Sequence, residues 1–267
     1  MKPIRIYAIF LRQIYLLRGN LTRFFQMFIW ITVDILLWGF ISKYFTGVGN
    51  AHMNFFAVLL GAILLWDFFG RMMQSIATAF FEDVWARNFL NIFASPILIS
   101  EYLTGLVLTG VVTSLVAFVV MLFLAGVVFG FSILVYGFAV IPFLIILFLF
   151  GIALGIVGVS IVLRLGPPAE WFVWPIPAVI SPFVGVIYPL SILPHWMQFV
   201  GHLLPPSYVF EGVRAIVAGG TFSGSAFAIG LCLSLMYIAL AYFIFLAVYR
   251  KAIRTGLIAR YSAESVN

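Results

Sequence analysis

The chain has 267 residues, of which 65% are hydrophobic, 18% aromatic and only 8% charged. A soluble domain carries about 25% charged residues and could not hide this much apolar surface, so the composition excludes a soluble fold and predicts a protein whose solvent is lipid. The formal net charge is +6, and the basic residues lie at the ends of apolar segments. A membrane surface therefore explains the charge, and no nucleic-acid partner is expected.

The first segment, residues 1–23, is too charged to cross a membrane. Arg5 and Arg12 are seven residues apart, so they share one face of a helix among aliphatic residues and tyrosines. We predict an amphipathic helix over residues 4–18 that lies along the cytoplasmic membrane surface and ends at Gly19-Asn20. Two interpretations fit it: an anchor that only follows the distribution of positive charge, or a dedicated functional helix.

Six apolar segments follow, each near the length of about 20 residues that crosses a bilayer. They are residues 24–45, 54–79, 103–129, 133–163, 171–190 and 226–249. A turn at 129–132 separates the third from the fourth, and Pro167-Pro168 separates the fourth from the fifth. The sequence therefore predicts one all-α integral membrane domain over residues 1–267, with six transmembrane helices.

Basic residues set the predicted orientation. The first segment and the tail after residue 249 are rich in Arg and Lys, and Arg87 and Arg164 fall in loops on the same side. The positive-inside rule then places both termini in the cytoplasm.

The cytoplasmic loop 80–101 mixes polar and apolar residues over 82–94, which predicts a short amphipathic helix that ends before Pro96. Such a helix between two spans suits docking into a groove of a soluble partner, and the alternative is a loop helix that contacts only lipid. The polar residues of the candidate docking helix are Glu82, Asp83, Arg87, Asn88 and Asn91.

Three charged residues are predicted deepest in the membrane: Asp34, Asp67 and Arg71. Such charges are costly and usually face protein or water. Asp67 and Arg71 are four residues apart, which favours a local ion pair. For Asp34 three roles stay open: a place on a substrate path, a contact between two copies, or an ion pair with Arg71.

Glycines in the fourth predicted span allow a second helix to approach closely. They are Gly151, Gly155 and Gly158. The partner helix belongs either to the same chain or to a second copy.

The apolar pattern breaks up after residue 188, at Pro189, Pro194 and Pro205-Pro206. Irregular backbone at membrane depth requires shielding by protein or a watery cavity, so we predict short re-entrant helices over 189–225, on the outer side between the fifth and sixth spans. Glu211 and Arg214 are three residues apart and predict an ion pair that braces this region.

Aromatic residues of the same region are candidates for an outer gate: Tyr188, Trp196 and Tyr208. His195 and His202 are typical of interfacial residues, and no metal site is predicted because further ligands are lacking.

Three parts of the chain resemble the ABC-2 family of ATP-binding-cassette transporter permeases. Residues 87–105, RNFLNIFASPILISEYLTG, are similar to that family's coupling-helix region. Residues 189–220 are similar to its outer segment, with the order of prolines, LP, Trp, Tyr, EG-x-R and GG. The amphipathic start is the third part.

The resemblance implies a transport subunit rather than an enzyme. It implies pairing of two permease copies, with a homodimer expected, and two separate ATPase subunits that bind ATP and Mg, since this sequence has no phosphate-binding loop of its own. The docking residues at 82–91 become candidate ATPase-coupling residues. Relatives export lipid-linked glycans, lipids and drug-like amphiphiles across the cytoplasmic membrane of prokaryotes.

Two other functional classes would require different sequence features. A membrane-embedded transferase or hydrolase needs converging polar residues, and the few acidic residues here are scattered along the sequence. A passive channel needs a recognisable filter or a ring of charge, and none stands out.

Overall fold

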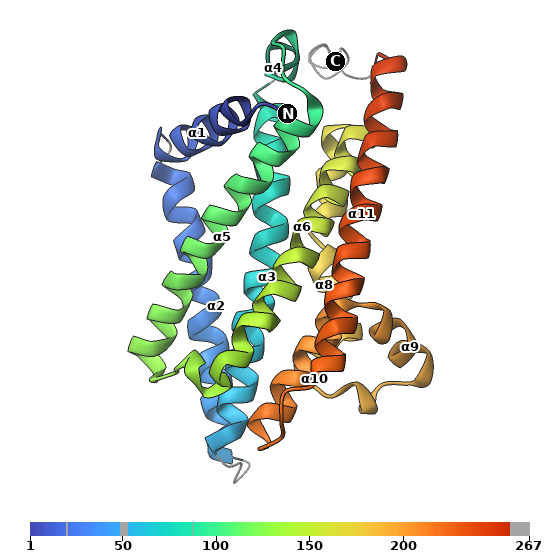
Figure 1. The fold of residues 1–267 in the computed structure, drawn as a ribbon. Helices are drawn as coiled ribbons and strands as arrows, with labels where there is room; N and C mark the ends of the chain where they lie inside the picture. Colours follow the sequence, from blue (N-terminus) through green and yellow to red (C-terminus); the bar gives the residue numbers. More distant parts are fainter. Residues whose placement is uncertain (20, 49–52, 87, 257–267) are drawn as a thin grey trace.

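The computed structural model describes residues 1–19, 21–48, 53–86 and 88–256, and within these ranges it contains helices and no strands (Figure 1). The α-helices are α1 Pro3–Gly19, α2 Leu21–Val48, α3 Met53–Trp85, α4 Phe89–Ala94, α5 Ile99–Phe129, α6 Val140–Leu165, α7 Glu170–Val173, α8 Ile176–Val184, α9 His195–Leu203, α10 Pro205–Val217 and α11 Gly224–Arg254. Short 3-10 helices are η1 Ile133–Ala139, η2 Pro167–Ala169 and η3 Leu190–Ile192.

Among the described residues, four helical stretches are long and apolar enough to cross a membrane, and they indicate a multi-pass membrane protein. They are Ile29–Gly47, Ile99–Phe129, Ile133–Leu165 and Gly224–Arg254. They coincide with the first, third, fourth and sixth predicted spans. The turn predicted between the third and fourth spans is present, and Gly130 ends α5 with a φ of 66°, a conformation that favours glycine.

The second predicted span lies in α3, which is one helix of 33 residues. It is the central helix of the bundle, packed against α5 on one side and α6 on another (Figure 1). Glycines on α6 permit this packing: a Cβ added at Gly151 would lie 2.9 Å from Met72 Cβ, and one at Gly155 would lie 2.9 Å from Ile76 Cβ. The glycine motif therefore serves a contact within the chain.

The fifth predicted span, 171–190, is not a single helix. It is divided between α7 and α8, and α8 ends at Val184 before Gly185, whose φ is 69°. Proline explains the break, because it lacks an N–H and its ring clashes with the carbonyl four residues earlier; Pro175 lies at the interruption between α7 and α8.

The two ends of the bundle differ. The start of α1, the short α4 and the end of α11 gather at one end, whereas the turn between α5 and α6 and the helix α10 lie toward the other (Figure 1). The amphipathic helix predicted over 4–18 is confirmed as α1, and α9 projects sideways from the bundle.

Candidate functional site

A cavity of about 610 Å³ opens beside α3. Its walls come from α1, α2, α3, α5, α8 and the turn before α8. The residues that line it are Gln13, Leu17, Trp30, Asp34, Trp66, Asp67, Gly70, Arg71, Gln74, Ser75, Thr78, Ala79, Glu82, Trp85, Thr109, Thr113, Trp174 and Pro177. This volume lies within the range of about 300–1,000 Å³ that is usual for sites of small organic ligands.

One face of α3 supplies the polar wall. Its polar residues recur every three or four positions, which places them on one stripe of the helix. They are Asp67, Arg71, Gln74, Ser75, Thr78 and Glu82. The opposite face is mostly apolar and buried, with Met72, Met73 and Ile76 at 0% exposure. The stripe is visible in the sequence as regular polar interruptions of an apolar segment, but only its charged members were predicted as site residues.

The charges in the cavity pair differently from the prediction. Arg71 Nη2 lies 3.7 Å from Asp34 Oδ2, so the ion pair joins α3 to α2. No hydrogen bond or close ion pair of the Asp67 carboxylate is found within the described part of the chain, so the predicted local pair of Asp67 with Arg71 does not form as a direct contact, although the two opposite charges attract each other at longer range. Of the open roles for Asp34, the pair with Arg71 is observed, and Asp34 also lines the cavity.

Four tryptophans contribute apolar surface to the same cavity: Trp30, Trp66, Trp85 and Trp174. Trp85 Nε1 donates a hydrogen bond of 2.9 Å to Glu170 Oε2, which ties the end of α3 to the start of α7. The Trp66 ring packs against Phe69 and Phe210, with centroid distances of 4.7 Å and 6.0 Å. The cavity thus combines aromatic faces with a few charged groups.

A buried polar cluster lies where α1 meets α3 and α5. We call it the Asp83 cluster, and it comprises Arg12, Gln13, Asp83 and Tyr102. Asp83 is fully buried, and its carboxylate accepts hydrogen bonds from Arg12 Nη2, from Tyr102 Oη at 2.7 Å and from Gln13 Nε2 at 3.5 Å. Burial lowers the pKa of the Arg12 guanidinium, but its hydrogen bond to Asp83 and the Asp83 charge outweigh this, so the pKa is raised. The cluster fixes α1 on α3 and α5.

A second attachment of α1 lies nearby. Glu101, also fully buried, accepts hydrogen bonds from the backbone N–H of Lys2 at 2.6 Å and of Leu98 at 3.0 Å, and Arg5 Nη1 lies 3.4 Å from its carboxylate. The two arginines that share a face of α1 therefore each meet a buried carboxylate of another helix.

The predicted docking helix over 82–94 has different boundaries in the structure. Glu82 and Asp83 belong to the end of α3 and are buried, so they do not form an exposed docking face. Only α4, of six residues, remains as a separate helix. Asn91 Nδ2 donates to Asn88 Oδ1 at 3.0 Å in an exposed position, and Arg87 lies outside the described residues.

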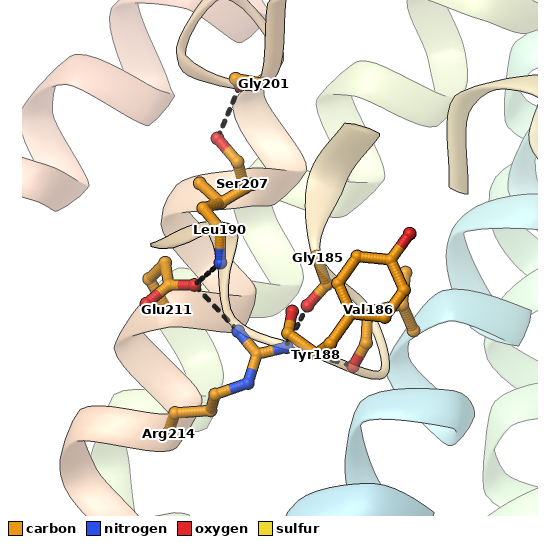
Figure 2. A network of polar contacts seen from close by, with 8 residues as sticks. All are labelled: Gly185, Val186, Tyr188, Leu190, Gly201, Ser207, Glu211 and Arg214. Atoms are coloured by element: carbon orange, nitrogen blue, oxygen red, sulfur yellow. Dashed lines mark hydrogen bonds and ion pairs between the residues drawn. The ribbon is translucent and has the colours of Figure 1, made fainter. Parts of the chain in front are cut away.

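The predicted brace between Glu211 and Arg214 is confirmed, with Arg214 Nη1 2.9 Å from Glu211 Oε1. Figure 2 shows the Arg214 guanidinium against the loop after α8, where Nη2 donates to the carbonyls of Gly185, Val186 at 3.2 Å and Tyr188 at 2.8 Å. Glu211 Oε1 also accepts from the backbone N–H of Leu190 at 2.9 Å. Burial lowers the pKa of Arg214, and the Glu211 charge acts in the opposite direction.

The three candidate gate aromatics are not brought together within the chain. Tyr188 Oη donates to the carbonyl of Pro182 at 2.9 Å, and Tyr208 Oη donates to that of His202 at 2.9 Å. Trp196, on the projecting α9, is 63% exposed. Tyr188 and Tyr208 therefore each bond to a nearby backbone carbonyl rather than to another of the three aromatic residues.

No three His, Cys, Asp or Glu side chains of the described residues are placed to hold a metal ion. No protein-family model matches the chain, and no curated protein matches its sequence.

Proposed function

We propose that this chain is the membrane-spanning permease subunit of an ATP-driven exporter of the ABC-2 type. It moves an amphiphilic molecule from the cytoplasmic side outward and has no catalysis of its own. The observation that carries the proposal is the cavity beside α3, which lies within an otherwise apolar bundle and offers both aromatic and charged surface. A path for a molecule with polar and apolar parts needs both kinds of surface.

The proposed topology has six crossings. To the four apolar stretches we add α3, as the second crossing, and the interrupted α7–α8 segment, as the fifth. An even number of crossings places both termini on the same side of the membrane, and the basic residues of α1 and of the end of α11 favour the cytoplasm for that side. The α9–α10 region then belongs to the outer side.

Energy comes from two separate ATPase subunits, which bind ATP and Mg. We assign their contact to α4. Asn91 on this helix is exposed, and Asn88, which directly precedes the helix, is partly exposed. The Asp83 cluster supports this contact from behind, because it holds the end of α3 that leads into the loop before α4. A second copy of the chain completes the conduit.

Reconstitution tests the proposal directly. The chain would be co-expressed with ATPases encoded beside its reading frame, purified through a tag on this chain alone and inserted into proteoliposomes. We expect an ATPase to co-purify and its hydrolysis rate to rise in the presence of cargo candidates. An ATPase whose phosphate-loop lysine is replaced is the matched control, since it assembles but does not hydrolyse ATP. Purification of the chain without any ATPase, from cells that produce both proteins, contradicts the proposal.

A further inference from the structure

We infer that the cavity beside α3 binds a cationic amphiphile, with the positive group of the ligand between Asp34 and Asp67 and its apolar part against the tryptophans. As a statement about cargo, this inference rests on the export function proposed above. As a statement about binding, it rests on the cavity alone.

The charges of the cavity favour a cation. Two carboxylates, Asp34 and Asp67, share one guanidinium, Arg71, which lies 3.7 Å from Asp34 and also attracts Asp67, so the three groups carry one more formal negative charge than positive. The carboxylate of Asp67 receives no hydrogen bond or ion pair from the residues described here, although it lines the cavity. A carboxylate at membrane depth is costly unless an opposite charge or donors compensate it. A bound cation supplies that compensation.

The aromatic wall matches the rest of such a ligand. Trp30 lies four residues before Asp34 on α2, and Trp66 lines the same cavity as Asp67, so the cavity offers aromatic surface together with both carboxylates. Indole faces attract cations and also bury apolar groups. Quaternary ammonium, phosphonium and protonated amine amphiphiles share these two properties.

The test compares two probes of nearly equal shape and opposite charge. Tetraphenylphosphonium and tetraphenylborate would be titrated against the full-length chain in bilayer discs of zwitterionic phospholipid, with empty discs subtracted, and quenching of tryptophan fluorescence would be followed. We expect saturable binding of the phosphonium and only non-saturable partition of the borate. Saturable binding of the borate with equal or higher affinity overturns the inference and points to an anionic headgroup held by Arg71.

A variant pair locates the site. Asp67→Asn keeps the shape of the side chain and should weaken phosphonium binding by about tenfold or more, since an opposite charge close to the ligand is lost in a medium of low dielectric constant. Glu211→Gln removes a carboxylate outside the cavity and should leave the affinity unchanged. Unchanged affinity in Asp67→Asn overturns the inference.

These outcomes are separate from those of the export proposal, because no ATPase is present. If the chain binds both probes without charge selectivity, the cation site is rejected, and the chain can still export another cargo. If the cation site is found but the chain recruits no ATPase, the site stands and the export proposal is rejected.

Discussion

Asp67 and Asp83 lie on the same helix, but they differ in burial and in the hydrogen bonds that they accept. Asp83 has no exposed surface and accepts hydrogen bonds from three side chains of two other helices. Asp67 faces a cavity and receives no bond from the described residues. A buried carboxylate with a full set of donors holds helices together, whereas one left without donors at a cavity wall is poised to meet something that the chain itself does not supply.

The largest effect is expected at the paired carboxylate. Asp83→Asn should lower the free energy of unfolding by about 3 kcal/mol or more, because it leaves the Arg12 guanidinium without its counter-charge in a mostly buried cluster. Asp67→Asn should leave stability unchanged or raise it, because the carboxylate that is removed accepts no hydrogen bond from the described residues. Thermal unfolding of the two variants in the same detergent checks this, and equal melting temperatures would erase the distinction between the two residues.

A smaller effect is expected when one donor of the cluster is removed. Tyr102→Phe deletes the hydroxyl that donates to Asp83 at 2.7 Å, and hydrogen bonds to charged groups contribute about 1.5–3 kcal/mol. We expect a loss of stability in that range, and no further loss when the substitution is added to Asp83→Asn. Additive losses in the double variant would mean that the two residues do not act on each other.

The two faces of α3 offer a third test. Gly155→Ala places a methyl group 2.9 Å from Ile76 Cβ and 3.1 Å from the Met73 carbonyl, so it should destabilise the chain by about 1–3 kcal/mol through overpacking. Gly70 lines the cavity and has nothing within 4 Å of an added Cβ. Gly70→Ala should therefore stabilise the helix by up to about 1 kcal/mol. Chemical denaturation of both variants measures the difference, and a loss of stability in Gly70→Ala would mean that this face is not open.

The smallest effect on stability is expected at the projecting helix α9. Trp196 is 63% exposed, so Trp196→Ala should change the free energy of unfolding by less than about 1 kcal/mol. If a second copy covers this side chain in a closed gate, the same substitution should raise leakage through the assembled transporter. Proteoliposome leakage measured without ATP tests this, and an unchanged leak removes Trp196 from the gate.

The sequence was sufficient to predict the structure where the deciding contact joins residues that are close in the chain. The Glu211–Arg214 pair spans three residues of one helix, and the α1 helix and the turn at Gly130 follow from side-chain spacing and backbone preference alone. The local rule failed for Asp67 and Arg71, because the guanidinium turns toward Asp34 on a neighbouring helix. The partners of Asp83 could not be predicted from the sequence either, because Arg12 and Tyr102 approach it only after three helices have packed.

The polar stripe of α3 is an intermediate case. Its spacing is visible in the sequence, but a stripe of this kind faces either another polar helix or an open space. Only the arrangement of α1, α2, α5 and α8 around it decides that it faces a cavity.

The attachment of α1 also has a consequence for biogenesis. Arg12 and Asp83 are 71 residues apart, and Arg5 and Glu101 are 96 apart. At a synthesis rate of about 5–20 residues per second, α1 leaves the ribosome roughly 4–20 seconds before its acidic partners do. During that interval its arginines have only lipid headgroups and water to contact, so the first-made helix is among the last to reach its final place. A cysteine at Gln13 should thus react readily with a membrane-impermeant maleimide in nascent chains arrested before residue 83 and be shielded in the finished protein. Equal shielding in both would show that α1 settles without its carboxylates.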